Sequence, residues 1–180
     1  MSRVYVFLAD GFEEIEGLCA VDLLRRAGCD VITVSIMGRR EITGSHRIKV
    51  EADALFEEID RKADMLVLPG GMPGTNYLKS HAGLAEYLNE QYGQQGYIAA
   101  ICAAPSVFEG LGFLEGRKAT SYPGCLGENV GCYLEEPVVT DGHVTTSRGV
   151  GTAIPFALRL IEILKGKDKA EEIASSIIYD

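Results

Sequence analysis

The chain has 180 residues, of which 47% are apolar, and a formal net charge of −9 at neutral pH. This length predicts one domain, residues 1–180, whose core needs no disulfide or metal to be stable. The negative charge opposes sequence-independent binding to nucleic acid or to an anionic membrane, and no apolar run approaches the roughly 20 residues of a membrane-spanning helix. We therefore expect a soluble, cytoplasmic protein.

Apolar strands and amphipathic helices alternate along the chain. In chain order the expected elements are a strand at 4–8, a helix at 13–26, a strand at 31–36, a β-ribbon across 39–54, a strand at 65–68, a helix at 84–92, a strand at 97–101, a helix at 105–113, a hairpin with strands at 138–140 and 144–146, and helices at 152–164 and 170–178. This alternation favours an α/β fold with a mostly parallel sheet and helices on both faces. The loops after such strands build the functional site.

The strand at 97–101 passes without a spacer into a helix, through Cys102-Ala103-Ala104-Pro105. Such a turn resembles a nucleophile elbow, in which a strained backbone exposes the side chain at the sheet edge. The N–H groups and dipole of the following helix favour the thiolate, so we expect Cys102 to be the most reactive of the five cysteines. The alternative interpretation is a small, inert core residue.

Two other loops follow predicted strands. Gly70-Gly71 can bring backbone N–H groups close to an anion or a substrate, although this loop lacks the lysine of a phosphate-binding P-loop. Glu13 and Glu14 are explained by the dipole of the helix that they begin. Glu16 lies one turn further in, where burial would raise its pKa and let it exchange a proton with a sulfur.

Cysteine and histidine spacing excludes several classes of site. The five cysteines form no C-x-x-C pair, which argues against a disulfide framework and a thioredoxin-type centre. Cys125 and Cys132 lie in an irregular segment where they could be exposed. His46, His81 and His143 lack ligand spacing, so we predict no metal and no organic cofactor.

Four ordered segments together resemble a known family. They are Ala9-Asp10-Gly11-Phe12-Glu13-Glu14-Ile15-Glu16, Leu68-Pro69-Gly70-Gly71, Ala99-Ala100-Ile101-Cys102-Ala103-Ala104-Pro105 and Thr146-Ser147-Arg148-Gly149-Val150-Gly151-Thr152. On these segments the chain resembles the ThiJ/PfpI family over nearly its whole length, and within it the branch of the parkinsonism-associated protein deglycase.

The resemblance implies a flavodoxin-like fold, a homodimer and a single reactive site. By this resemblance Cys102 is the nucleophile and oxidation-sensitive thiol, and Glu16 is its protonated carboxyl partner. Gly71 and Ala103 would supply N–H donors near the sulfur, and Arg26 would reach an anion site near the dimer interface. The implied activity is glyoxalase or deglycase chemistry on 2-oxoaldehydes or their adducts, together with protective roles under oxidative stress and as a chaperone.

The sequence departs from the family pattern at three positions. Tyr122 stands before Pro123 where the deglycase branch has a histidine, so an auxiliary acid or base is either missing or replaced by a phenol. His46 stands about where the branch has an arginine, which makes an anion site there dependent on pH. Ala103 follows the nucleophile where the peptidase branch has a histidine, which argues against proteolysis.

Two main hypotheses use the same residues. In the first, the Cys102 sulfur adds to an aldehyde and Glu16 moves protons toward a 2-hydroxy acid. In the second, Cys102 is a non-catalytic sensor or regulates a chaperone through its oxidation. An amidotransferase-like hydrolase is a weaker alternative, because no late His-x-Glu pair completes a Cys-His-Glu arrangement.

Overall fold

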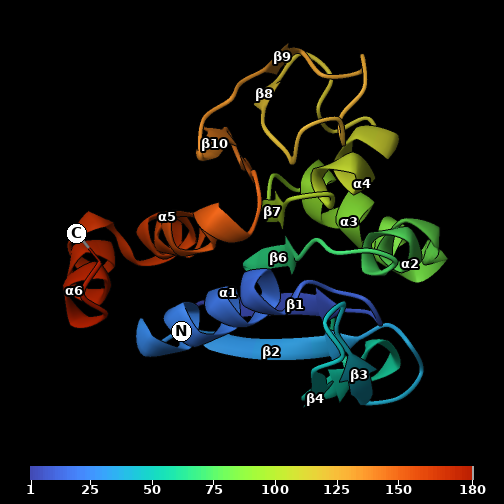
Figure 1. Ribbon diagram of the computed structural model, residues 1–180, viewed down its shortest axis with the longest axis horizontal. Helices are drawn as coiled ribbons and strands as arrows, with labels where there is room; N and C mark the ends of the chain where they lie inside the picture. The colour runs from blue at the N-terminus through green and yellow to red at the C-terminus, as the bar shows by residue number, and fades with distance from the viewer. Residues whose placement is uncertain (180) are drawn as a thin grey trace.

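The computed structural model describes residues 1–179 and contains a seven-stranded sheet with helices on both faces (Figure 1). The strands of this sheet are β1 (Arg3–Leu8), β2 (Asp30–Ser35), β5 (Ala54–Leu55), β6 (Met65–Leu68), β7 (Tyr97–Ile101), β10 (Val138–Asp141) and β11 (Val144–Ser147). Their spatial order is β10-β11-β7-β6-β1-β2-β5, and only the β10–β11 pair is antiparallel. The parallel strands β2-β1-β6-β7-β11 thus have the flavodoxin-like order, which confirms the predicted fold class.

Two groups of helices cover the two faces of the sheet. The α-helices are α1 (Glu14–Arg26), α2 (Gly74–Ser80), α3 (Ala82–Gly93), α4 (Pro105–Gly110), α5 (Ala153–Lys165) and α6 (Lys167–Ser176). Helices α1, α5 and α6 pack in one apolar cluster and α2, α3 and α4 in the other, on opposite sides of the strands in Figure 1. No helix within residues 1–179 combines the length and apolar character needed to cross a bilayer.

Strand β1 shows why the sheet needs cover on both sides. Val4, Val6 and Leu8 contribute to the cluster beneath α1 and α5, while Tyr5 and Phe7 contribute to the cluster beneath α3. Successive side chains of a strand point to opposite faces, so an uninterrupted apolar strand has to be buried on both. All five side chains are at most 1% exposed.

Several predicted elements differ from the observed ones. Helix α2 was not predicted, because it is only seven residues long and begins at a glycine. Helix α4 ends at Gly110 rather than Phe113, before the positive φ of 80° at Gly112. The β-ribbon is confirmed as β3 (Glu41–Thr43) and β4 (Lys49–Glu51), and Ile48, which precedes β4, is 52% exposed.

Short elements complete the structure between these segments. They are the 3-10 helices η1 (Phe56–Glu58) and η2 (Val150–Thr152) and the strands β8 (Lys118–Ala119) and β9 (Cys132–Tyr133). His143, beside the turn between β10 and β11, is half-buried against the Tyr92 ring, with ring centroids 4.8 Å apart.

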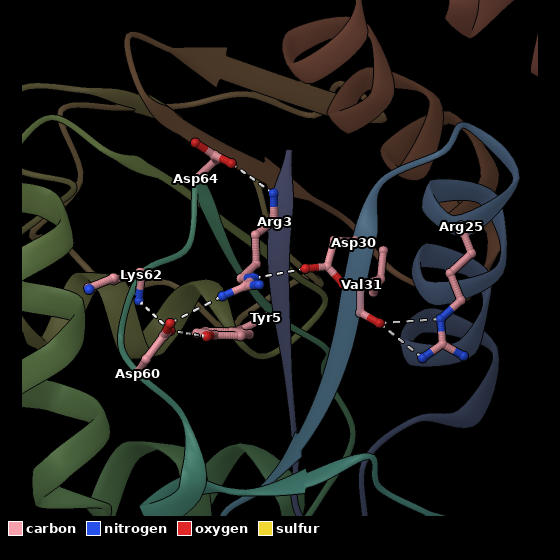
Figure 2. Close-up of polar contacts among 8 residues, drawn as sticks. All are labelled: Arg3, Tyr5, Arg25, Asp30, Val31, Asp60, Lys62 and Asp64. Atoms are coloured by element: carbon pink, nitrogen blue, oxygen red, sulfur yellow. Dashed lines mark hydrogen bonds and ion pairs between the residues drawn. The ribbon is translucent and has the colours of Figure 1, made fainter. Parts of the chain in front are cut away.

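A network of polar side chains lies at the amino ends of the central strands (Figure 2). The Arg3 guanidinium pairs with Asp30 at 2.8 Å and with Asp60 at 3.2 Å, while the Arg3 backbone N–H donates to Asp64. The buried Tyr5 hydroxyl donates to Asp60 Oδ1 at 2.6 Å. Burial, followed by the hydrogen bond from this hydroxyl to Asp60, raises the pKa of Tyr5 to about 12. Exposed ion pairs contribute little, so the Tyr5 hydrogen bond is the stabilising contact here.

Replacing Tyr5 with phenylalanine should lower the free energy of unfolding by about 1 kcal/mol, because the ring still fits but the hydrogen bond is lost. Urea unfolding of the Tyr5→Phe variant measures this change. The matched control is Tyr97→Phe, which removes a hydroxyl from a ring that is 38% exposed. Equal unfolding midpoints for the two variants would contradict the stabilising role of the Tyr5 hydroxyl.

Candidate active site

The turn after β7 presents Cys102 at the carboxyl edge of the sheet. Its backbone has a positive φ of 65°, a region that non-glycine residues seldom adopt. The Cys102 N–H donates to the Ser147 carbonyl at 3.0 Å and its own carbonyl accepts from the Tyr122 N–H at 2.9 Å. Backbone hydrogen bonds on both sides therefore hold the strained turn, as a nucleophile elbow requires.

The sulfur of Cys102 is accessible rather than sealed in the core. The residue is half-buried and lines a surface cavity of about 550 Å³. Glu13, Glu16 and Tyr122 also line this cavity, together with the segment from Arg148 to Thr152. The sequence-based expectation of a cysteine at a strand end, in a pocket, agrees with this placement.

The structure brings Glu16 to Cys102 from the loop and helix that follow β1. Glu16 is 1% exposed and lines the same cavity as Cys102. The Glu16 Oε2 accepts from the Gly70 N–H at 3.0 Å, whereas Oε1 is buried with no partner within the described chain. Burial is the main cause that raises the pKa of Glu16 to about 7.

The surroundings of Cys102 favour the protonated thiol, whereas the sequence predicted that they favour the thiolate. Burial, followed by the charge of Glu16 and its hydrogen bond, raises the pKa of the thiol to about 12. The N–H groups of Ala103 and Gly71 hydrogen-bond to the sulfur and act in the opposite direction. Helix α4 has only six residues, so its dipole is too weak to outweigh burial. The thiol must therefore lose its proton to a nearby base as it reacts.

The glycines after β6 permit this close approach. A β-carbon at Gly70 would lie 2.6 Å from the Cys102 Cβ and 2.6 Å from the Glu16 Oε2. Gly71 has a positive φ of 91°, and a β-carbon there would lie 2.3 Å from the Glu13 nitrogen. Larger residues would push the β6 loop away from the cysteine, so the two glycines set the distance between Glu16 and Cys102.

Glu13 and Glu14 have specific partners in addition to the helix dipole. Glu13 Oε2 caps α1 by accepting from the Glu16 N–H at 2.8 Å. Glu14 accepts from the His46 N–H at 2.7 Å and lies 2.8 Å from the His46 Nδ1. Although burial opposes the change, the hydrogen bonds from His46 lower the pKa of Glu14 to about 2, and that of His46 is raised. The dipole interpretation of these two acids was incomplete.

Of the other candidate site residues, Tyr122 lines the Cys102 cavity, whereas His46 and Arg26 do not. Tyr122 lines the cavity and is 55% exposed, so its phenol is available to a ligand. His46 lines an adjacent cavity that shares Glu13 and Val150 with the first, and its Nδ1 pairs with Glu14. Arg26, the last residue of α1, pairs with Asp22 at 2.8 Å and does not line the Cys102 cavity.

One part of the cavity wall received no role from sequence reasoning. The segment from Arg148 to Thr152 follows β11, and the Thr152 Oγ1 accepts from the N–H groups of Arg148 at 3.2 Å and Gly149 at 3.0 Å. Thr152 Oγ1 also lies 2.7 Å from the Ser147 Oγ. The sequence does contain a signal for a site loop here, because a glycine-rich run directly follows a predicted strand.

Residues 2–163 match the model of the DJ-1/PfpI family. The chain belongs to this family. A relative from Drosophila melanogaster, protein dj-1beta, is 38% identical over 177 residues, which cover 96% of this chain and 95% of the relative. Arabidopsis thaliana DJ-1 homolog A is 39% identical over 97% of this chain, which spans only 46% of that relative's length.

Other members of the family have related names and closely similar structures. A Pyrococcus abyssi protein named deglycase is 30% identical over 91% of this chain and 99% of its own length. The crystal structure of Drosophila melanogaster DJ-1beta superposes with a TM-score of 0.95 at 38% identity, with both chains fully covered. The oxidized form of Toxoplasma gondii DJ-1 superposes with a TM-score of 0.95 at 35% identity, covering 99% of each chain. The family resemblance found in the sequence is therefore confirmed.

Proposed function

We propose that the protein is a cofactor-independent glyoxalase or deglycase-like enzyme acting on 2-oxoaldehydes or their adducts. The observation that carries this proposal is that Cys102 and the buried Glu16 both lie against Gly70 and line one accessible cavity. With a pKa of about 7, Glu16 can both accept and return a proton near neutral pH. The relative named deglycase supports the same chemistry.

The proposed reaction begins at the aldehyde carbon of methylglyoxal. Ionised Glu16 takes the thiol proton as the Cys102 sulfur bonds to that carbon, and then passes the proton to the carbonyl oxygen to give a hemithioacetal. Glu16 next removes the hydrogen on this carbon as a proton and delivers it to the neighbouring ketone carbon, while the hemithioacetal hydroxyl gives its proton to the ketone oxygen. The first carbon is thereby oxidised to a thioester, and the second is reduced to a carbinol.

Water completes the reaction. It attacks the thioester carbon, the carbon–sulfur bond breaks, and lactate leaves while Cys102 recovers its proton. The sum is methylglyoxal plus water giving lactic acid, with no external oxidant or reductant. Tyr122 lies on the cavity wall where it can position the substrate in place of the family histidine.

The purified protein should therefore convert methylglyoxal to lactate without added thiol or metal, at a rate that rises as Glu16 ionises around pH 7. Lactate is measured enzymatically after removal of the protein, and methylglyoxal loss is followed in parallel. Methylglyoxal consumption without lactate, at the same rate as with heat-denatured protein, would contradict the proposal.

A second candidate function is that of an oxidation sensor. A structural relative has been solved in an oxidized form, and Cys102 is accessible to solvent. Two equivalents of peroxide would convert the thiol to a sulfinic acid and release two molecules of water. The raised pKa of Cys102 lowers the thiolate fraction available to peroxide.

The homodimer expected from the resemblance is part of the same proposal. Ile15, Ile48 and Val150 are 55%, 52% and 43% exposed and line one cavity beside His46. Ile15 lies in the first turn of α1, and its exposure is explained if a second copy covers this face.

A further inference from the structure

Arg148 is the one cationic residue that lines the Cys102 cavity. Its Nε is buried and has no hydrogen-bond partner among residues 1–179. A buried guanidinium nitrogen without a partner is unfavourable, because arginine donors are normally satisfied by carboxylates, carbonyls or water. Neither the proposed proton transfers nor the packing of the loop uses this side chain.

The backbone around Arg148 is held against the reacting groups. The preceding residue, Ser147, accepts the Cys102 N–H, and the Arg148 N–H itself donates to the Thr152 Oγ1. A β-carbon at the next residue, Gly149, would lie 3.6 Å from the Tyr122 Cδ2 and 3.8 Å from the Glu16 Oε1. The arginine therefore extends from a fixed loop beside both Cys102 and Glu16.

The carboxylates of the cavity do not neutralise Arg148. Glu13 directs Oε2 to the Glu16 N–H, and its Oε1 lies 3.6 Å from the His46 Nδ1. Glu16 Oε2 accepts from the Gly70 N–H. In the part of the chain that the structure describes, no ion pair joins Arg148 to either acid, so its guanidinium remains available to a ligand in a protein whose net charge is −9.

We propose that Arg148 recognises a carboxylate on the substrate, so that the preferred substrates are 2-oxoaldehydes bearing an acidic tail. Guanidinium and carboxylate groups match in geometry and form charge-assisted hydrogen bonds. The inference rests on the proposed function and narrows its substrate class. A suitable substrate is 4,5-dioxopentanoate, which with one molecule of water would give 2-hydroxyglutarate by the steps described for methylglyoxal.

A pair of alkylating reagents tests the charge of the site without requiring turnover. Iodoacetate and iodoacetamide both lose iodide to the Cys102 sulfur, but only iodoacetate is an anion. Mass-resolved labelling at pH 9 gives the labelling ratio, which is the rate with iodoacetate divided by the rate with iodoacetamide at Cys102. This ratio should fall about tenfold in Arg148→Met, corresponding to one charge-assisted interaction, and remain near the wild-type value in Arg148→Lys.

Arg159→Met is the matched control, since Arg159 lies on α5, pairs with Glu162 and is absent from the cavity lining. It should leave the ratio unchanged. A ratio unaltered by Arg148→Met would overturn the inference. If Arg148→Met fails to fold, two other measurements test the inference: the labelling ratio in the Arg148→Glu variant, and the wild-type ratio in about 0.5–1 M salt, where the Debye length falls to about 3–4 Å. A labelling ratio that changes in neither measurement also overturns the inference.

Turnover separates this inference from the proposed function. The ratio of kcat/KM for 4,5-dioxopentanoate to that for the uncharged 2-oxopentanal should fall about tenfold in Arg148→Met, mainly through KM. A fall in the labelling ratio without turnover of either aldehyde would support the anion site and contradict the enzyme. Turnover of both aldehydes with an unchanged kcat/KM ratio would support the enzyme and contradict the role of Arg148.

Discussion

Replacing Cys102 with serine is expected to lower kcat/KM for methylglyoxal by more than about 10³-fold, because a hydroxyl is a far weaker nucleophile than a thiol and cannot form the thioester. Serine differs from cysteine by one atom, and the backbone hydrogen bonds to Ser147 and Tyr122 do not involve the side chain. The variant should therefore fold normally.

Lactate formation by the Cys102→Ser variant measures this loss, and far-UV circular dichroism with thermal unfolding checks the fold. Cys132→Ser serves as the control, because Cys132 is exposed and lies outside the cavity. Full activity in Cys102→Ser would exclude Cys102 as the nucleophile. Equal losses in both variants would assign the effect to general damage rather than to the site.

Replacing Glu16 with glutamine should lower kcat/KM by about 10²–10⁴-fold, the usual contribution of a general acid–base group. Glutamine keeps nearly the same shape and can still accept from the Gly70 N–H, but it cannot take the thiol proton. The rise in wild-type activity around pH 7, where Glu16 ionises, should disappear in the variant. An unchanged pH–rate profile in Glu16→Gln would assign that ionisation to another group.

The same substitution should stabilise the protein at alkaline pH. Glu16 has an ordinary pKa of 4.5 and a pKa of about 7 in the folded protein, so the folded state holds its proton more tightly. The resulting stability is fully present below pH 4.5 and is lost as pH rises through 7, a loss on the order of 3 kcal/mol. Glu16→Gln avoids this loss because it never ionises.

Urea unfolding at pH 4.5 and pH 8.5 measures this effect, with Glu128→Gln as a control at an exposed carboxylate. We expect similar stability of wild type and Glu16→Gln at pH 4.5, and a more stable variant at pH 8.5. A less stable Glu16→Gln protein at pH 8.5 would contradict the buried, high-pKa assignment. Reduced activity combined with greater stability would identify Glu16 as a residue retained for chemistry.

Local patterns in the sequence were sufficient for the fold class and the position of the reactive cysteine. Uninterrupted apolar runs such as 4–8 and 65–68 have to be buried on both faces, and only a parallel sheet covered by helices does this. The abrupt change from strand to helix at Cys102 is equally local, and the observed positive φ follows from it. Elements of marginal length, such as α2, carry too little periodicity to be predicted.

The protonation chemistry of the site was decided only by the tertiary structure. Residues 16, 70, 102 and 148 are far apart in the sequence and meet because the parallel strands β1, β6, β7 and β11 end at one edge of the sheet. A pKa depends on burial and on neighbours within a few ångströms, which no single segment specifies. The sequence by itself therefore determined which side chains could react. The packing decided that Cys102 and Glu16 line one cavity, that burial raises the pKa of both, and that the Arg148 Nε has no partner among residues 1–179.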